Sequence, residues 1–215
     1  MNSRAISDLS IRARRHFCLK LMPTTHLLYL HGFLSSPASN KARMTAAAVA
    51  QHHPAVTWLC PMLAASPRQA MQETLQAIAD WPRESMAIVG SSLGGFYATW
   101  LAERLGCKAA LLNPAVRPAR DLAPHVGEQT LWHDAAVHFV LEPHYIDELR
   151  AMELAQISRP ERYFAVIAKG DEVLDWREMQ QHFVKANIKL LDASDHALSD
   201  YAQHLDEVLG FLDLV

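Results

Sequence analysis

The 215-residue sequence has little cysteine, little net charge and no long uninterrupted apolar run. Its three cysteines, Cys18, Cys60 and Cys107, are too few and too scattered for a disulfide framework or a paired-cysteine metal site, and they favour a reducing compartment. The formal net charge of −3 gives no strong field for binding nucleic acid or an anionic membrane surface. The charge-free stretch at residues 85–102 is interrupted by glycines and serines, so we expect no membrane insertion.

Residues 1–24 differ from the rest in carrying several arginines and a single acidic residue, Asp8. They lack the continuous apolar segment of a secretory signal peptide, although such a composition can resemble an organelle transit peptide. The physiological start could also be Met22. We expect residues 1–24 to be a disordered extension, because chain termini are commonly disordered.

From residue 25 onward, short apolar runs alternate with helical patterns, which predicts a single α/β domain over residues 25–215. The runs are continuously apolar, as expected for strands of a mostly parallel sheet covered by helices on both faces. The predicted fold is therefore a three-layer sandwich with a mostly parallel sheet. Predicted strands cover residues 26–30, 55–60, 85–90, 108–112, 162–168 and 188–191, and predicted helices cover 36–51, 67–78, 93–105 and 200–211.

Residues 117–158 interrupt this alternation and are long for a plain connection. A helical pattern runs from about Ile146 to Ala155. The segment either crosses the carboxyl edge of the sheet as a small cap or is an ordinary helical crossover without a role in substrate binding. The pattern leaves both interpretations open.

The sequence Gly90-Ser91-Ser92-Leu93-Gly94 matches G-x-S-x-G and lies between a predicted strand and a predicted helix. That context is typical of a nucleophile elbow, in which a sharp turn exposes the serine hydroxyl and small residues let the backbone pack closely. The helix dipole favours the negative charge that develops there during attack. We therefore predict Ser92 as a nucleophile.

A nucleophilic serine needs a base and an acid, which in this kind of domain follow it in the order Ser, Asp, His. Asp171 follows the predicted strand 162–168, and His196 follows the strand 188–191. We expect His196 to accept the Ser92 proton and Asp171 to orient the imidazole. Glu172 and Asp175 remain alternatives for the acid. Asn113, after the strand 108–112, occupies a place where some hydrolases carry the acid, but it cannot serve as a carboxylate.

An oxyanion hole requires two backbone N–H donors, which we expect at Leu93, directly after the nucleophile, and at Phe33, after the first strand, with Leu34 as the alternative to Phe33. His31 is expected to shape that loop structurally. Arg117 is a candidate for binding an anionic group of the substrate, although a salt-bridge role is the more common use of such a residue.

Several histidines without a metal-ligand spacing, among them His133, His138 and His144, give no reason to expect a metal.

Four blocks of the sequence resemble the YqiA-like bacterial esterases, a branch of the α/β-hydrolase superfamily. The blocks are Leu28–Phe33 followed by Ser35-Ser36-Pro37, Gly90–Thr99, Asn113–Pro118 and Gly170–Asp175. The resemblance covers nearly the whole chain from about Thr25, and it places the family's serine, aspartate and histidine on Ser92, Asp171 and His196. It implies hydrolysis of carboxylic esters and acyl-CoA thioesters in the cytoplasm without a cofactor. Residues 1–21 and the glycine-poor stretch around His196 depart from the family pattern.

The residues and the resemblance together predict a serine hydrolase that cleaves esters through an acyl-enzyme, with acyl-CoA thioesters as a second candidate substrate class. The expected partners are small ester or acyl-CoA substrates. Two alternatives stay open: a related enzyme that cleaves amide or C–C bonds, and a hydrolase-like binding protein without turnover.

Overall fold

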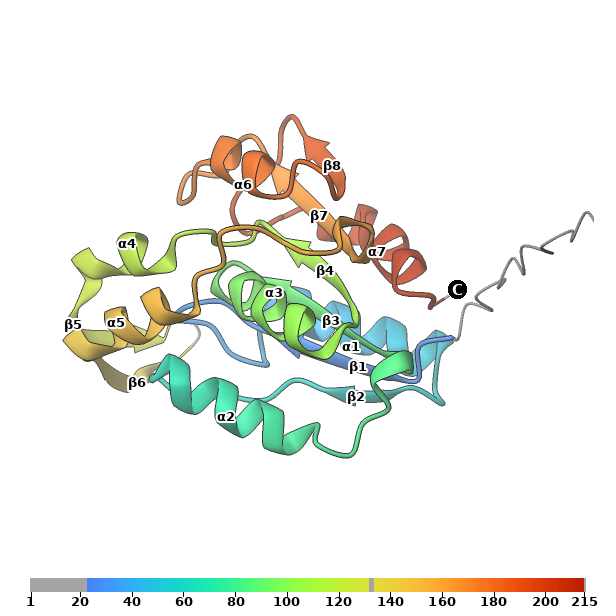
Figure 1. The fold of residues 1–215 in the computed structure, drawn as a ribbon, viewed down its shortest axis with the longest axis horizontal. Helices are drawn as coiled ribbons and strands as arrows, with labels where there is room; N and C mark the ends of the chain where they lie inside the picture. The colour runs from blue at the N-terminus through green and yellow to red at the C-terminus, as the bar shows by residue number, and fades with distance from the viewer. Residues whose placement is uncertain (1–22, 132–133, 215) are drawn as a thin grey trace, which may run out of the picture.

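The computed structural model describes residues 23–131 and 134–214, and a six-stranded parallel sheet forms its centre (Figure 1). The strand order β2-β1-β3-β4-β7-β8 means that the chain starts one strand in from an edge, adds β2 outside β1, and then adds the other four strands in order on the opposite side. The bounds are β1 His26–Leu30, β2 Thr57–Leu59, β3 Met86–Ser91, β4 Lys108–Leu112, β7 Tyr163–Ala168 and β8 Asn187–Leu191. Every predicted strand is present, with small shifts at its ends.

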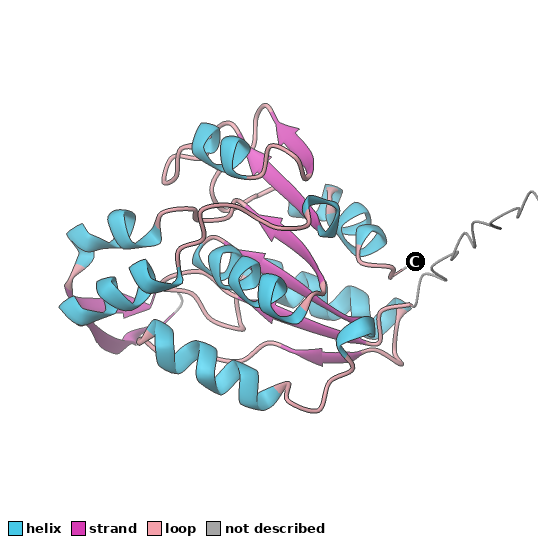
Figure 2. Ribbon diagram, viewed as in Figure 1, coloured by secondary structure: helices cyan, strands magenta, loops and turns pink. Residues whose placement is uncertain are grey.

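Helices cover both faces of the sheet, so the predicted three-layer α/β sandwich is confirmed (Figure 2). Alternate side chains of each central strand enter two separate apolar layers, which is why the strand sequences are apolar throughout. One layer packs against α1 (Asn40–His52) and α7 (Leu205–Phe211). The other packs against α2 (Pro67–Ala77), α3 (Leu93–Leu105) and α6 (Trp176–His182).

Two predicted helices have different starts in the structure. The helix predicted from residue 36 begins at Asn40, because Ser36 belongs to a turn in which its Oγ accepts the Ala38 N–H at 3.2 Å. The helix predicted over 200–211 is divided into a single 3₁₀ turn, η4 (Tyr201–Gln203), and α7. Other 3₁₀ turns are η1 (Arg83–Ser85), η2 (Ala123–His125) and η3 (Pro160–Arg162).

The expected N-terminal extension lies outside the described residues up to position 22. Thr24, which we had included in it, is ordered: it is buried, and its hydroxyl donates to the Leu212 carbonyl at 2.5 Å. This bond ties the entry to β1 to the C-terminal end of α7. The structured domain therefore begins slightly earlier than predicted.

The cap segment, residues 117–158, contains a small sheet that the sequence analysis did not predict. The segment consists of α4 (Pro118–Leu122), the small sheet, which is formed by the antiparallel strands β5 (Gly127–Leu131) and β6 (Asp134–Leu141), and α5 (Pro143–Met152). Figure 1 shows these elements gathered at one end of the central sheet, opposite the end at which β1 begins.

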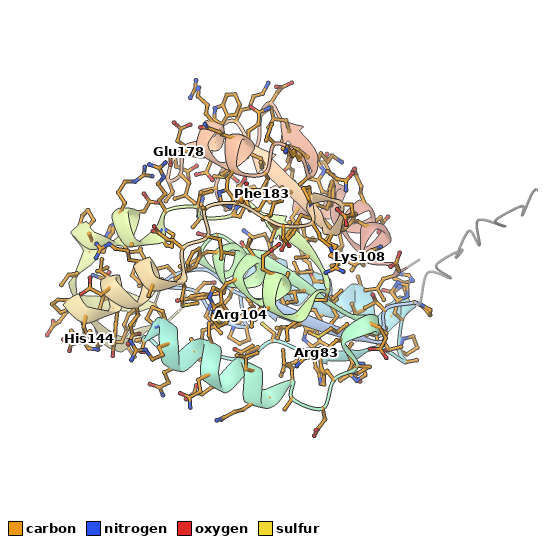
Figure 3. All side chains as sticks on the ribbon, viewed as in Figure 1. Arg83, Arg104, Lys108, His144, Glu178 and Phe183 are labelled. Atoms are coloured by element: carbon orange, nitrogen blue, oxygen red, sulfur yellow. The ribbon has the colours of Figure 1, made fainter. Side chains whose placement is uncertain are left out.

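An ion pair connects the cap segment to α6. Both terminal nitrogens of Arg120, in α4, donate to the Glu178 carboxylate at 2.7 Å. Figure 3 shows Glu178 on the side of α6 that faces α4. Because a bidentate pair fixes both distance and orientation, it holds α4 at a set distance from α6.

None of the helices in the described ranges is long and apolar enough to cross a membrane.

Candidate active site

Ser92 lies at a strained turn between β3 and α3, as the G-x-S-x-G pattern predicts. Its φ of +55° and ψ of −120° are unusual for a residue with a side chain, and a strained backbone of this kind is typical of functional sites. The turn is fixed on both sides: the Ser92 N–H donates to the Leu112 carbonyl at 2.9 Å, and the Ser92 carbonyl accepts from Gly95 at 2.8 Å and Ala115 at 3.0 Å.

The glycines of the motif are required because backbone groups lie where a Cβ atom would be. A Cβ on Gly90 would overlap the carbonyl of Gly94 and approach Ala98 Cβ to 2.6 Å. A Cβ on Gly94 would overlap the carbonyl oxygens of Leu30 and His31. The start of α3 is therefore packed directly against the end of β1, which brings the loop after β1 to Ser92.

His196 and Asp171 form a hydrogen-bonded line with Ser92, although they are distant in sequence. His196 Nε2 lies 3.1 Å from Ser92 Oγ, and His196 Nδ1 lies 2.7 Å from Asp171 Oδ2. The residues follow β3, β7 and β8, whose carboxyl ends meet at one edge of the sheet. The structure thus brings together the three side chains that the sequence analysis selected.

Asp171 is the carboxylate on the histidine, and the two alternatives have other contacts. The Asp171 side chain is fully buried, and its second oxygen accepts the N–H groups of Val173 and Leu174 at 2.9 and 2.8 Å. Glu172 instead accepts the backbone N–H of His196 at 3.0 Å. Asp175 caps α6 by accepting a backbone N–H at 2.9 Å.

The N–H groups of Phe33 and Leu93 are both available as oxyanion donors. Phe33 and Leu93 line the same cavity as Ser92, and neither N–H has an acceptor among the residues that the structure describes. The N–H of Leu34, a residue with a φ of +55°, is likewise without an acceptor in the described chain. Gly32 makes room for this loop, since a Cβ there would lie 3.1 Å from Ser92 Cβ.

His31 acts structurally in this loop. Its Nε2 accepts the Leu63 N–H at 3.2 Å, so the proton is on Nδ1, which donates to the Gly32 carbonyl at 3.0 Å. Burial lowers the pKa of His31, which favours this neutral form. The imidazole therefore links the loop after β1 that carries Phe33 and Leu34, which we call the oxyanion loop, to the loop after β2.

Two cavities meet at the oxyanion loop and Leu93. The first, the catalytic chamber, measures about 360 Å³ and is lined by Ser92, His196, Lys41 and residues of α4. The second, the apolar chamber, measures about 200 Å³. The cap segment forms one wall of it through Leu131, Phe139 and Leu141.

Asn113 is a buried residue whose contacts the sequence analysis missed. Its Oδ1 accepts the Ala168 N–H at 2.8 Å, and its Nδ2 donates to the carbonyls of Asp195 and His196 at 2.9 and 3.1 Å. The side chain therefore bridges β7 and the loop that carries His196, residues 194–197, which we call the histidine loop. Its position after a strand was visible in the sequence, but nothing there indicated these partners.

Arg117 is not brought together with Ser92. It is exposed and lines a separate open cavity that also includes Glu153, His182 and Lys185. It is absent from the described residues that line the catalytic chamber. As for metals, the described residues contain no cluster of three or more His, Cys, Asp or Glu side chains placed to hold an ion.

Most of the chain matches a known protein family. The model of a family described as "Uncharacterised protein family (UPF0227)" matches residues 26–213. The chain belongs to this family. The match covers the whole sheet and the cap segment, and it agrees with the predicted resemblance to YqiA-like proteins.

Solved structures show the same fold at low sequence identity. Mouse alpha/beta hydrolase domain-containing protein 10 matches with a TM-score of 0.66 and 14% identity over 88% of this chain and 91% of that one. A structure of the metagenome-derived lipolytic enzymes LipS and LipT matches with a TM-score of 0.64 and 19% identity, covering 88% and 94%. Est1E from Butyrivibrio proteoclasticus, with bound ferulic acid, matches with a TM-score of 0.63 and 14% identity, covering 89% and 87%. This member of UPF0227 therefore has the α/β-hydrolase fold.

Proposed function

We propose that the protein hydrolyses carboxylic esters, and acyl-CoA thioesters among them, through an acyl-enzyme on Ser92. The observation that carries the proposal is the line of hydrogen bonds from Asp171 through His196 to Ser92, at 2.7 and 3.1 Å, beside two backbone N–H groups that have no acceptor among the described residues. Neighbours of the same fold that are named as an esterase and as lipolytic enzymes support the same reaction class.

In this mechanism Ser92 Oγ attacks the carbonyl carbon while its proton passes to His196 Nε2. The N–H groups of Phe33 and Leu93 stabilise the oxyanion, and removing one donor of this kind typically costs about 10²–10³ in kcat. Asp171 holds the Nδ1–H tautomer and stabilises the imidazolium. The intermediate collapses when His196 returns the proton to the departing alcohol or thiol, and water then repeats the sequence to release the acid.

The two chambers give the substrate a direction. The leaving atom must lie within reach of His196 Nε2, which places the alcohol or thiol in the catalytic chamber. The acyl chain then extends past the oxyanion loop into the apolar chamber, whose side chains are mostly hydrocarbon. An acyl chain of moderate length suits a chamber of about 200 Å³.

The first experiment is labelling with a fluorophosphonate probe, followed by intact-mass analysis, because it needs no choice of substrate. We expect one adduct on the wild type and none on Ser92→Ala, and an unchanged adduct on the control Ser158→Ala, which removes an exposed serine hydroxyl. Hydrolysis of 4-nitrophenyl butyrate and of butyryl-CoA then tests ester and thioester turnover. An unlabelled wild type with a normal circular dichroism spectrum would contradict the proposal and favour a binding protein.

A further inference from the structure

A lysine side chain lies in the wall of the catalytic chamber without a carboxylate partner. Lys41, in the first turn of α1, donates from Nζ to the carbonyl oxygen of Ala197 at 2.5 Å. Ala197 directly follows His196, and both line the catalytic chamber together with Lys41. Within the described part of the chain, no carboxylate oxygen lies within 4.0 Å of Nζ, unlike the ion-paired Lys108, Lys169 and Lys189.

The acidic side chains of the chamber have partners of their own. Asp121 is paired with Arg120, at 2.8 Å from Nε and 2.7 Å from a terminal nitrogen, and Glu172 accepts the His196 N–H. The Lys41 ammonium, by contrast, is bound by a neutral carbonyl. Burial lowers the pKa of Lys41 to about 8, against the opposing effects of Asp195 and Asp171. A partly buried cation with a single neutral partner is stabilised by any anion that enters the chamber.

Lys41 lies on the side of the site from which the leaving group departs. The histidine must protonate the leaving atom, so the leaving group is next to His196, and Lys41 is bonded to the residue after it. The apolar chamber, in which the acyl chain is placed, includes neither Lys41 nor His196 among its lining residues in the described chain.

We propose that Lys41 binds an anionic group on the leaving alcohol or thiol, which makes esters and thioesters with a carboxylate- or phosphate-bearing leaving group the preferred substrates. This inference rests on the proposed function, because it assigns a direction to the same hydrolytic site. Lys41 is then a specificity residue that takes no part in the chemical steps.

The test compares butyrate esters that differ only in the leaving group. One is the neutral 4-carbamoylphenyl ester, the second carries a 4-carboxylate, and the third carries a 4-phosphonomethyl group. We expect kcat/KM of the wild type to be about tenfold or more higher for the preferred anion than for the neutral ester, as one charge-assisted hydrogen bond provides. Comparing kcat/KM for the carboxylate ester with kcat/KM for the phosphonate ester shows which anionic group the site prefers.

Two variants assign the preference to this lysine. Lys41→Met should remove the preference for anions. Loss of its contact with the histidine loop lowers kcat/KM for all three esters alike, so the ratio between the anionic and neutral esters reports the charge alone. Arg43→Met removes one positive charge from the same helix at an exposed position outside the chamber, and it should keep the preference. The preference should also weaken at high salt, because salt screens a partly exposed pair.

The pH dependence of the preference provides an independent measurement. The ammonium is present below its pKa of about 8 and is lost above it. The ratio of kcat/KM for the 4-carboxylate ester to kcat/KM for the neutral ester should therefore fall between about pH 7 and about pH 9. Dividing one ester by the other cancels ionisations that govern the common chemical steps. The charged and titratable groups around Lys41 are Asp171, Asp195, Glu172 and His196, with His31 in the loop after β1 and Asp121 and His125 on the cap side of the chamber.

The outcomes separate this inference from the proposed function. Equal hydrolysis of the neutral and anionic esters, unaffected by Lys41→Met, would refute the lysine's role and leave the esterase standing. A similar loss on all three esters in Lys41→Met would show that the lysine only tethers the histidine loop, and would also refute the inference. Hydrolysis of none of the esters would overturn both proposals.

Discussion

Asn113→Ala is predicted to lower both stability and turnover, because the buried Asn113 amide bridges β7 and the histidine loop. The residue is 1% exposed. Truncation leaves the buried Ala168 N–H without its acceptor and removes one donor from each of the Asp195 and His196 carbonyls. An unsatisfied buried group costs about 1–3 kcal/mol, and the two carbonyls, which are only part-buried, add less.

The expected cost to the free energy of unfolding is therefore about 2–4 kcal/mol. For a domain of this size, each kcal/mol lowers Tm by about 2–4 °C, so the expected shift is roughly 5–15 °C. The histidine loop keeps its contacts with Asp171, Glu172 and Lys41, and should remain close to its place. A displacement of about 1 Å at His196 can still cost about 10²-fold in rate, so we expect kcat to fall about 10- to 100-fold with a smaller change in KM.

The assay combines thermal unfolding with steady-state hydrolysis of 4-nitrophenyl butyrate, measured well below the Tm of the variant. Asn187→Ala is the matched control, because that exposed asparagine makes a single bond of 3.3 Å to the Tyr163 carbonyl. Its effect should stay within about 0.5 kcal/mol. Asn113→Asp keeps an acceptor for Ala168 but turns a carboxylate toward two carbonyl oxygens.

The repulsion in Asn113→Asp should raise the pKa of the introduced carboxyl in the folded state. Its destabilisation should therefore grow with pH above the unfolded value of about 3.9 and shrink on acidification. If Asn113→Ala kept the wild-type kcat and a Tm within about 2 °C, the bridge would not be what holds the histidine loop.

Further outcomes follow from the same contacts. Asp171→Asn should lower kcat by about 10⁴ with little change in Tm, because the remaining oxygen still accepts two backbone N–H groups; full activity would reassign the acid. Gly94→Ala should give little folded protein in a solubility and circular dichroism assay, since its Cβ would overlap the Leu30 carbonyl, and a normal yield would contradict that packing. Ala64→Leu narrows the apolar chamber, so the octanoate-to-acetate ratio of kcat/KM should fall several-fold, and an unchanged ratio would place the acyl chain elsewhere.

The sheet and the meeting of Ser92, Asp171 and His196 could be predicted because both follow from one rule of parallel sheets. Apolar runs identify the strands, and polar residues directly after them converge at the carboxyl edge whatever their separation in sequence. The choice of Asp171 over Glu172 needed the structure. Neighbouring carboxylates have the same sequence signal, and only the turn shows that one faces the imidazole and the other a backbone N–H.

The small sheet within the cap segment and the bridging residues could not be predicted, for a different reason. No glycine-containing pair of the kind that marks a tight hairpin lies between Leu131 and Asp134, so β5 and β6 had no local signal. The contacts of Asn113 span 55 to 83 residues, and those of Lys41 span 156. A hydrogen bond between residues so far apart in the sequence leaves no periodic pattern from which it could be predicted.

The histidine loop shows why such bridges are needed. The sequence from Ser194 to Ala197 contains no glycine and forms no regular element, so local backbone preference does not fix His196. Separate parts of the chain hold it: Asn113 from the end of β4, Glu172 from the loop after β7 and Lys41 from α1. A Cβ on Gly170 would overlap the Ser194 carbonyl, so the loop also rests directly on the Asp171 turn. Of these contacts, the one from Lys41 is made by a charge that a substrate can share. In the proposed mechanism, substrate recognition and the placement of His196 therefore meet at a single side chain, and this is why the neutral and anionic esters must be compared in the same variant.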